Sequence, residues 1–288
     1  MLLSGTTKLL GVMGHPIAHS LSPVMHNAAL AQLGLDYVYL PLPVKPENLE
    51  VAIAGFAAIG IQGFNVTIPH KQSVMALMSD ISAIAQAVGA VNTVSWTEQG
   101  WVGTNTDVAG FVAPLQPLSA DWSQRTALVL GNGGSARAVV AGCAQLGCGQ
   151  VQVAGRNVEK LEAFLHSWSA SPIPVNLSVH LWDDLPTLLP HADLLVNTTP
   201  LGMYPQVERS PLTASELELL KPGAIAYDLI YTPDPTRFLQ LAQASGAVTI
   251  NGLEMLVQQG AAALEYWIQQ PAPVEVMREA LLDRLKDR

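Results

Sequence analysis

The residue with the clearest chemical potential is Lys71, which ends the segment Asn65-Val66-Thr67-Ile68-Pro69-His70-Lys71. It is one of only three lysine or arginine side chains before residue 110, together with Lys8 and Lys45. A surface lysine usually lies among other charges, whereas this one follows an apolar run and a short polar cluster closed by a proline. We therefore predict that Lys71 is placed for chemistry.

An acidic partner for this lysine occurs in the segment Gly103-Thr104-Asn105-Thr106-Asp107. The segment has two interpretations, a simple polar loop or one half of a proton-transfer pair formed by Lys71 and Asp107. A lysine amine has an ordinary pKa of about 10.4, so burial or neighbouring groups must assist its proton exchange near neutral pH. Because a nearby carboxylate favours the charged amine, we assign Asp107 chiefly to orientation and substrate binding.

Two hydroxyl groups in the segment Ser20-Leu21-Ser22-Pro23 are suited to hydrogen-bond the carboxylate of a substrate. The alternative is that Ser22 only caps the helix that follows, with Pro23 in its first turn.

Other kinds of catalytic site find no support in the sequence. Prolines interrupt the spacing of the early histidines and no carboxylates accompany them, so we reject a metal site; these histidines are His15, His19, His26 and His70. No G-x-S-x-G elbow is present, and Cys143 lies in an apolar helical stretch, which argues against serine or cysteine hydrolase chemistry. Cys143 and Cys148 are predicted to be reduced core residues.

A glycine-rich turn in the second half of the chain follows an apolar strand and opens a helix. The G-x-G-x-x-G/A fingerprint of dinucleotide-binding proteins requires this context. Spaced glycines let the backbone turn sharply and approach a pyrophosphate, and the small Ala136 allows close packing of the helix. An ordinary tight turn is the alternative, but we predict a dinucleotide site, whose residues are Gly131, Asn132, Gly133, Gly134 and Ser135.

The end of the next strand indicates which dinucleotide is bound. An NAD site usually has Asp or Glu there to bind the ribose 2′-hydroxyl, but this strand ends Ala154-Gly155-Arg156-Asn157. Arg156 can pair with a 2′-phosphate, and Lys160 follows as a second cation. A solvated arginine at a strand end is the alternative. Together with the glycine turn, the pattern favours NADP, contacted by Gly155, Arg156, Asn157 and Lys160.

Two blocks of alternating strands and helices must position these residues. The first predicts strands at 9–13, 36–42 and 63–68 and helices at 23–33 and 49–59. The second predicts strands at 127–130, 151–154, 193–197, 224–229 and 247–250, and helices at 135–146, 158–167 and 235–244. Residues 114–123, with two prolines, predict an extended connection between the blocks. Long helical patterns follow Gly252 and Pro271 and are expected to pack back onto the first block. An α/β fold with mostly parallel sheets follows.

Composition limits the partners of this 288-residue chain. Its net charge of -9 disfavours nucleic acid, which needs a basic field to displace counterions from phosphate. No apolar run approaches the length of a membrane span, and no basic head precedes an apolar segment at the N-terminus, so we expect no membrane contact and a cytoplasmic protein. With 49% apolar and 13% charged residues, a two-domain enzyme acting on small molecules is predicted.

Further short blocks accompany these motifs in order along nearly the whole chain. They are Ser20 to Pro23 with Met25-His26-Asn27, Asn65 to Lys71, Gly89-Ala90-Val91-Asn92-Thr93, Gly103 to Asp107 with Gly110, Gly131 to Ala138, Asn197-Thr198-Thr199-Pro200-Leu201-Gly202-Met203, Asp228-Leu229-Ile230-Tyr231 and Gly252 to Gln259. In these blocks the chain closely resembles the NADP-dependent shikimate dehydrogenases of aromatic amino acid biosynthesis.

The resemblance implies roles for particular residues. Lys71 would be the acid/base group and Asp107 its catalytic partner in the reversible NADPH-dependent reduction of 3-dehydroshikimate to shikimate. Leu229 and Gly252 would join the cofactor site. The residues implied to surround shikimate are Ser20, Ser22, Thr67, Lys71, Asn92, Asp107, Tyr231 and Gln259.

The family fold implies a substrate-binding domain at 1–110, completed by 253–288, and a Rossmann-like NADP-binding domain at 111–252. Two alternatives stay open. One is a quinate/shikimate dehydrogenase with broader cofactor use, against which Arg156 and the missing acid count. The other is a noncatalytic NADP-sensing protein, against which the presence of both Lys71 and Asp107 counts. The chain is expected to be a monomer or a homodimer.

Overall fold

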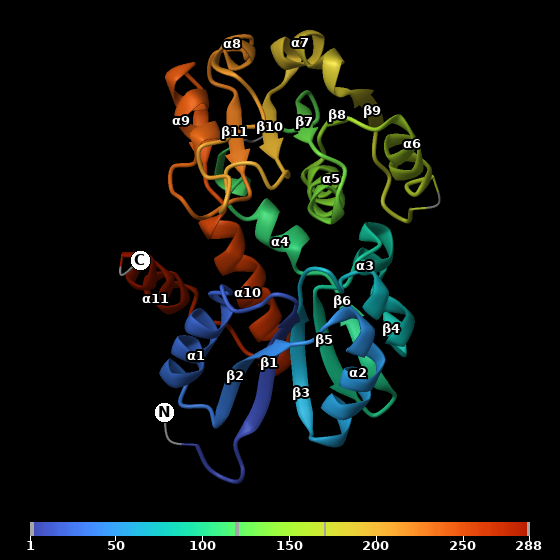
Figure 1. Cartoon of the computed structure of the whole chain (residues 1–288), viewed down its shortest axis with the longest axis vertical. Coiled ribbons are helices and arrows are strands. Elements are labelled where there is room, and N and C mark those ends of the chain that lie inside the picture. Colours follow the sequence, from blue (N-terminus) through green and yellow to red (C-terminus); the bar gives the residue numbers. More distant parts are fainter. Residues whose placement is uncertain (1–2, 119–120, 170, 287–288) are drawn as a thin grey trace. The chain divides into compact units, whose positions relative to one another are not determined.

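Alternating strands and helices build two separate sheets, one in each unit of the chain (Figure 1). The structure is a computed structural model that describes residues 3–118, 121–169 and 171–286. The first unit comprises Met1–Gly110 with Val257–Arg288, and the second comprises Phe111–Leu256. The predicted α/β class with mostly parallel sheets is confirmed.

The sheet of the first unit has the order β2-β1-β3-β5-β6-β4. The strands β2, β1 and β3 are parallel, but β5 pairs antiparallel with both β3 and β6. A tight turn joins β5 to β6, with Gly100 at a φ of 110°, which makes this neighbouring pair antiparallel. The strands are β1 (Lys8–Gly14), β2 (Tyr37–Pro43), β3 (Ile61–Val66), β4 (Asp80–Ile81), β5 (Thr93–Thr97) and β6 (Gly100–Thr104).

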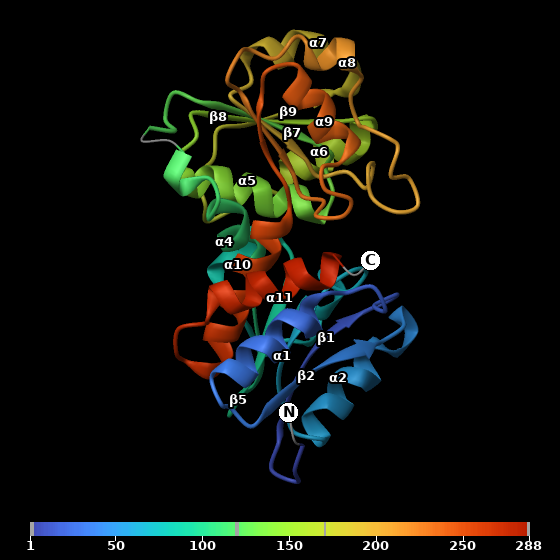
Figure 2. The same cartoon turned by 90° about the vertical axis from the view of Figure 1, so that its left-hand side faces the viewer.

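Helices cover this first sheet, including two from the end of the chain. The helix α11 contacts α1, and the two run side by side in both views (Figures 1 and 2). On α10, the Trp267 indole donates to the Val94 carbonyl at 2.9 Å, which attaches the helix to β5. The expected return of the C-terminal helices to the first domain is confirmed. The helices of this unit are α1 (Ser22–Gln32), α2 (Leu49–Ala58), α3 (Ala83–Val88) and α11 (Val274–Lys286), with 3-10 turns at Pro46–Asn48 and Ser73–Leu77. The helices α4 (Asp107–Val112) and α10 (Leu253–Ile268) each begin in one unit and end in the other.

The sheet of the second unit is parallel throughout and has the order β12-β11-β10-β7-β8-β9. Counted from β7 as the first strand, this order is 3-2-1-4-5-6 read from β9, which is the order of dinucleotide-binding α/β units. The strands are β7 (Thr126–Leu130), β8 (Gln150–Gly155), β9 (Leu177–Leu181), β10 (Leu194–Asn197), β11 (Ile225–Asp228) and β12 (Val248–Ile250).

The helices of the second unit cover the two faces of its sheet and enclose a core of leucine and alanine side chains. They are α5 (Gly134–Leu146), α6 (Val158–His166), α7 (Leu185–Leu188), α8 (Ala214–Leu217) and α9 (Arg237–Ala244). Short 3-10 turns occur at Gln116–Leu118, Trp182–Asp184 and Leu189–His191.

The alternative role of Ser22 as a helix cap and one local prediction were wrong. Ser22 does not cap α1, because the helix begins one residue earlier than expected and Leu21 occupies the cap position without a side-chain bond. The connection predicted at 114–123 is not extended where the structure describes it, because Leu115 and Trp122 are buried and the chain forms a turn and a 3-10 helix. Residues 119 and 120 of that prediction lie outside the described residues.

The cysteines and two of the early histidines, His26 and His70, can be placed in the structure. Cys143 is buried and Cys148 half-buried, and both are free thiols. Burial lowers the pKa of His26 to about 3, so its ring is neutral at physiological pH. The His70 ring lies 2.7 Å from the Val44 carbonyl. Within residues 3–118, 121–169 and 171–286, no group of His, Cys, Asp and Glu is arranged to hold a metal ion.

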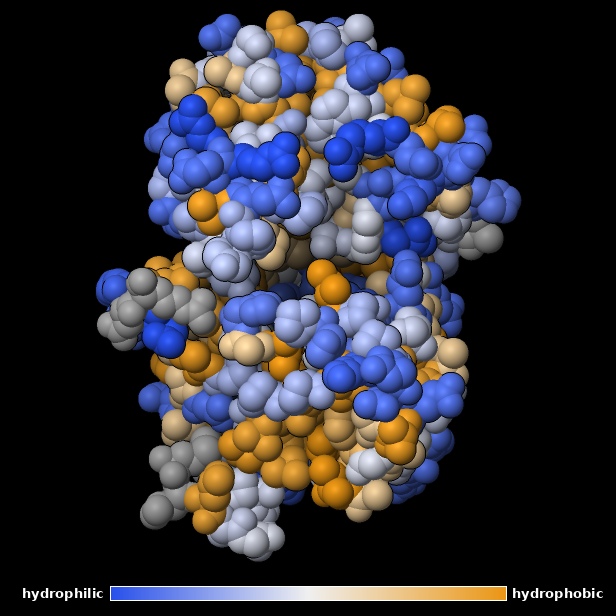
Figure 3. Space-filling view, viewed as in Figure 1, coloured by the Kyte–Doolittle hydropathy of each residue, from blue (hydrophilic) through white to orange (hydrophobic). Residues whose placement is uncertain are grey.

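The surface of the first unit carries a hydrophobic area over one end of its sheet (Figure 3). Exposed apolar side chains of this unit include Val51, Ile59 and Trp96. In the described part of the chain, no helix combines the length and the apolar character needed to cross a membrane.

The packing of Trp267 against the first sheet can be tested by mutation. A Cβ atom at Gly63 would lie 2.3 Å from the Trp267 Nε1 atom and 2.8 Å from the Val94 carbonyl oxygen. We expect Gly63→Ala to lower the free energy of unfolding by about 1–3 kcal/mol through overpacking. Urea denaturation measures this, with Gly55→Ala as the control.

Gly55 lies inside α2, and a Cβ there would meet nothing within 4 Å. Its replacement by alanine should stabilise the protein by about 0.5–1 kcal/mol because alanine loses less backbone entropy in a helix. Equal effects of the two variants would contradict the close packing of α10 on β3 and β5.

Candidate active site

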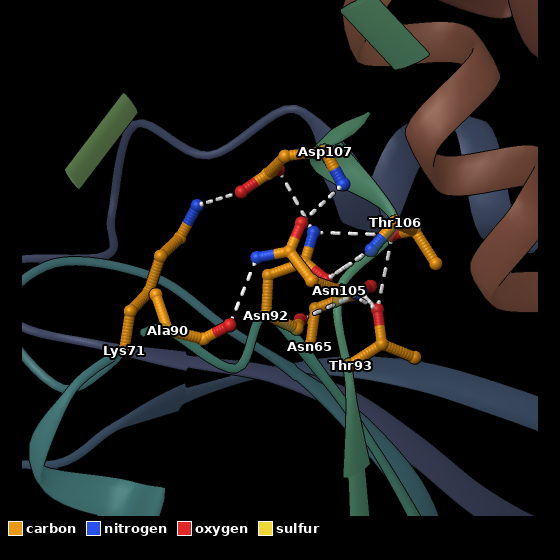
Figure 4. A network of polar contacts seen from close by, with 8 residues as sticks. All are labelled: Asn65, Lys71, Ala90, Asn92, Thr93, Asn105, Thr106 and Asp107. Carbon is orange, nitrogen blue, oxygen red and sulfur yellow. Dashed lines mark hydrogen bonds and ion pairs between the residues drawn. The ribbon is translucent and has the colours of Figure 1, made fainter. Parts of the chain in front are cut away.

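Lys71 and Asp107 form an ion pair in the first unit, with 2.6 Å between the Lys71 Nζ and Asp107 Oδ2 atoms (Figure 4). The Lys71 main chain is held by the Val91 amide, which donates to its carbonyl at 2.8 Å. The side chains are 26% and 14% exposed, so the pair is partly shielded yet open to a ligand. Such a charge-assisted bond is shorter and stronger than a neutral one.

The Asp107 carboxylate is oriented by a second partner. Its Oδ1 atom accepts a hydrogen bond from the Asn92 side-chain amide at 2.8 Å, which leaves Oδ2 for Lys71. The Asp107 main-chain amide donates to the Asn105 side chain at 3.0 Å, and Asn105 in turn donates to the Ala90 carbonyl at 2.9 Å. Asp107 therefore has little freedom to turn away from Lys71.

Asn92 is buried and joins three strand ends. Its Oδ1 atom accepts from the Thr106 amide at 2.7 Å and from the Thr93 hydroxyl at 2.9 Å. The Asn65 side chain donates to the Asn92 carbonyl at 3.1 Å, and the Tyr39 hydroxyl donates to Asn65 at 2.6 Å. This network fixes the ends of β3, β5 and β6 against each other (Figure 4).

Three further predicted substrate residues, Thr67, Ser20 and Ser22, follow strands β3 and β1 of the same sheet but do not belong to this network. Thr67 directly follows β3, and its amide donates to the Met13 carbonyl at the end of β1 at 2.9 Å. Ser20 lies on the segment between β1 and α1 and Ser22 is the first residue of α1; the Ser22 amide donates to the Ser20 hydroxyl at 3.3 Å. Because β1 and β3 are parallel, these segments leave the sheet at one edge.

Two predicted substrate residues come from other parts of the chain. Gln259 is half-buried on α10 in the first unit. Tyr231 is half-buried in the second unit, three residues after the end of β11. Among the predicted substrate residues, hydrogen bonds link Lys71 and Asn92 to Asp107.

Sequence reasoning missed Asn65, Thr93, Asn105 and Thr106 as individual site residues, although all four lie in the segments that drew attention. Their order along the chain gives no sign of which polar side chains face each other. Only the pairing of β3 with β5 and of β5 with β6 brings them together.

The glycine turn in the second unit joins β7 to α5. Gly131 has a φ of 100°, and a Cβ atom there would lie 2.9 Å from the Thr198 hydroxyl, so only glycine fits. At Gly133 and Gly134, by contrast, a Cβ atom would meet nothing within 4 Å. The backbone is therefore bare and open at the start of α5, where a pyrophosphate can approach the amide groups. Asn132 lies in the turn, and Ser135, in the first turn of α5, is exposed.

The end of β8 supplies cations and no acid. Gly155 ends the strand, where a Cβ atom would lie 3.0 Å from the Leu161 side chain. Arg156, Asn157 and Lys160 are exposed, and the Asn157 side chain caps α6 by accepting from the Lys160 amide at 2.8 Å. The charge and exposure suit a ribose carrying a 2′-phosphate.

Leu229 and Gly252 lie together at the same edge of the second sheet. A Cβ atom at Gly252 would lie 2.1 Å from the Leu229 carbonyl oxygen, and the Gly252 amide donates to the Ile230 carbonyl at 3.1 Å. This contact ties the segment after β12 to the one after β11. The accessible backbone amides of the glycine turn and the exposed cations after β8 are groups suited to bind NADP.

A parallel sheet with this strand order, a glycine turn at its first strand and a separate α/β unit with a lysine–aspartate pair define a two-unit dinucleotide-dependent dehydrogenase. Residues 12–94 match the family model of the shikimate dehydrogenase substrate binding domain. Residues 252–282 match that of the shikimate 5'-dehydrogenase C-terminal domain.

Known proteins are similar to this chain over nearly its whole length. The chain is 65% identical over 286 residues to the shikimate dehydrogenase (NADP(+)) of a Nostoc species, covering 99% of each chain. A crystal structure of a shikimate dehydrogenase in complex with NADP+ is similar with a TM-score of 0.88 and 38% identity, covering 98% of this chain and 97% of that one. The 5-ketofructose reductase of a Gluconobacter strain is similar with a TM-score of 0.86 and 30% identity, covering 97% and 99%. The chain belongs to the shikimate dehydrogenase family.

The open backbone of the glycine turn yields a prediction. Gly133 has extended backbone angles that alanine adopts, and a Cβ there meets no protein atom, so Gly133→Ala should change the free energy of unfolding by no more than about 0.5 kcal/mol. The methyl group would occupy the space needed by the pyrophosphate, so we expect the Kd for NADP+ to rise at least about tenfold. Isothermal titration calorimetry and urea denaturation measure the two effects.

The matching control is Gly147→Ala at the far end of α5, where the space is also open but φ is 80°. That variant should lose stability through backbone strain and keep its affinity for NADP+. Unchanged NADP+ binding by Gly133→Ala would contradict the placement of the pyrophosphate at this turn.

Proposed function

We propose that the protein is an NADP-dependent shikimate dehydrogenase that catalyses the reversible reduction of 3-dehydroshikimate to shikimate. The observation that carries the proposal is the Lys71–Asp107 ion pair, held by Asn92, in a chain of this family. A protein that only sensed NADP would have no use for a proton-transfer pair fixed in this way.

Lys71 acts as the acid in the reduction and as the base in the oxidation. Its Nζ atom donates a proton to the oxygen of the substrate ketone as that oxygen gains negative charge, and removes the proton from the hydroxyl group in the reverse direction. Asp107 holds Nζ in place through Oδ2, and Asn92 prevents rotation of the carboxylate. The pair is also suited to bind hydroxyl groups of the ring.

The other substrate residues recognise the carboxylate and the remaining hydroxyl groups. Ser20, just before α1, and Ser22, at its start, offer hydroxyl donors to the carboxylate; Ser20 is the more accessible of the two, because Ser22 is only 8% exposed. The amide and hydroxyl groups of Thr67, Asn92, Tyr231 and Gln259 supply further donors and acceptors.

NADPH, when bound, supplies the hydride for the reduction. The turn from Gly131 to Ser135 holds the pyrophosphate with backbone amides, and Arg156 with Lys160 pairs with the 2′-phosphate. Gly155 and Asn157 shape the end of β8 beneath these cations. Leu229 and Gly252 form part of the border of the cofactor site.

Two related activities are distinguished by one assay. Reduction of NADP+ and of NAD+ is followed by absorbance with shikimate or with quinate as the substrate. A strong preference for shikimate and NADP+ supports the proposal. Comparable rates with quinate or NAD+ would instead favour a quinate/shikimate dehydrogenase, and no turnover with any combination would favour the noncatalytic sensor.

We further propose a cytoplasmic location, where the reaction would meet the reduced cofactor pool. For the oligomeric state we keep the monomer and the homodimer as hypotheses. The hydrophobic area on the first unit (Figure 3) is a surface that a homodimer would bury. Light scattering after size-exclusion chromatography separates the two states.

Removal of the proposed acid/base group should affect the chemical step. We expect Lys71→Ala to lower kcat roughly 10²- to 10⁴-fold, with a much smaller change in the KM for shikimate, because proton transfer is lost while most binding groups stay. Lys45→Ala is the control, since Lys45 is an exposed lysine of the same unit. Near-normal turnover by Lys71→Ala would refute the assignment.

Removal of the proposed phosphate ligand should affect only the cofactor. We expect Arg156→Ala to raise the KM for NADP+ about tenfold to a hundredfold by loss of charge-assisted hydrogen bonds, with little change for NAD+. Arg125→Ala is the control, because Arg125 lies before β7 and its guanidinium packs over the Trp122 ring. If the two variants have equal KM values for NADP+, Arg156 does not contact the 2′-phosphate.

A further inference from the structure

A fully buried carboxylate lies at the end of β11 in the second unit. Asp228 is 0% exposed, and within the described residues it is the only buried side chain among the aspartates, glutamates, lysines and arginines. Its two main side-chain partners, Asn197 and Thr236, are also 0% exposed. The proposed reaction uses none of these three groups.

Three hydrogen bonds converge on this carboxylate. Its Oδ2 atom accepts from the Thr236 hydroxyl at 2.7 Å. Its Oδ1 atom accepts from the Asn197 side-chain amide and from the Ile230 main-chain amide, both at 3.1 Å. The Thr236 hydroxyl also caps α9 by accepting from the Leu239 amide at 3.3 Å. Asp228 thus ties the loop after β11 to the helix that follows it and to β10.

Asn197 extends the network toward the glycine turn. Its Oδ1 atom accepts from the Thr199 amide at 3.0 Å and from the Thr199 hydroxyl at 2.7 Å, and its Nδ2 atom donates to the Leu201 carbonyl at 3.3 Å. Thr199 is one of the two threonines that a Cβ at Gly131 would meet, at 3.3 Å. A continuous set of contacts therefore runs from the start of α9 to the glycine turn.

The position of the network in the sheet relates it to the cofactor. Asn197 ends β10 and Asp228 ends β11, and β10 lies beside β7, which leads into the glycine turn. The connection reverses direction between β7 and β10, and ligands of open α/β sheets bind outside the strand ends at such a point. The loops that Asp228 holds are thus the ones that border the site.

The free-energy cost of burying the Asp228 carboxylate indicates that it does more than fill space in the core. Burial raises the pKa of Asp228 to about 6, although the bonds from Thr236, Ile230 and Asn197 oppose this rise. A buried charge costs free energy, and a neutral side chain of similar shape would fill the same space at lower cost. The carboxylate accepts three bonds in one place, which an apolar side chain cannot do.

We infer that Asp228 is a positioning residue for the cofactor: its carboxylate, through Asn197 and Thr236, fixes the loops after β10 and β11 against the glycine turn. The inference rests on the proposed use of NADP. Loss of the carboxylate should let both loops move and weaken NADP+ binding, while shikimate recognition by the first unit should change little.

The test compares binding of NADP+ by calorimetry at a temperature where all variants are folded. We expect Asp228→Ala to raise the Kd at least about tenfold and Thr236→Val several-fold, while Thr236→Ser, which keeps the hydroxyl, stays within about twofold of the unmodified protein. Each variant should keep its KM for shikimate within about twofold.

Asp193→Ala is the matched control. Asp193 is a carboxylate of the same unit that accepts from the Thr126 amide at 2.8 Å and pairs with Lys221, but it lies just before β10, at the opposite end of the strands. Its loss should lower the melting temperature and leave the Kd for NADP+ within about twofold. A purely structural role for Asp228 would give it the same profile.

Two outcomes would overturn the inference. One is an unchanged Kd for NADP+ in Asp228→Ala with only a lower melting temperature. If that variant does not fold, equal Kd values for Thr236→Val and Thr236→Ser overturn it instead. Failure of the proposed function is distinguishable, because an unmodified protein that binds NADP+ without oxidising shikimate refutes the activity and leaves the binding comparison intact.

Discussion

The first unit depends on the need of one buried amide to satisfy all its hydrogen bonds. The Asn92 side chain is enclosed, so each of its donors and acceptors must find a protein partner. It finds them in Thr93, Thr106 and Asp107, which lie at the start of β5, just after the end of β6 and at the start of α4. The carboxylate of Asp107 is thereby fixed, and the position of the Lys71 amine follows from it. The Lys71–Asp107 ion pair is therefore held by buried side chains and not only by the loop that carries Asp107.

In the second unit, the main structural feature is a backbone that a large anion can approach. Parallel strands end at one edge, and the two glycines that start α5 leave the amide groups there uncovered. Gly131 works in the other direction, because its missing side chain lets Thr198 and Thr199 pack against the turn. Gly131 therefore permits close packing of the protein against the turn, whereas Gly133 and Gly134 leave the backbone exposed.

Much of the fold could be predicted from the sequence. The glycine turn, the cations at the end of β8 and the alternation of apolar strands and helices are local patterns, and their geometry depends on neighbouring residues alone. The errors had non-local causes. Serine is a common helix cap, but α1 begins at Ser22 itself, one residue earlier than expected, and this side chain is buried. No strand was predicted at the position of β5, whose antiparallel place in the first sheet depends on its pairing with β3, about thirty residues away.

The sequence by itself determined the family, the α/β class and the kind of residue at each site, because ordered motifs and periodic apolar positions are properties of the chain. It could single out Lys71 and Asp107, yet it could not show that they touch, since 36 residues separate them. Only the tertiary structure decided that contact, the role of Asn92 between strand ends, and the enclosure of Asp228 by Asn197 and Thr236. Hydrogen bonds of this kind form between side chains that strand pairing brings together, and pairing over long separations is set by the packing of the whole unit.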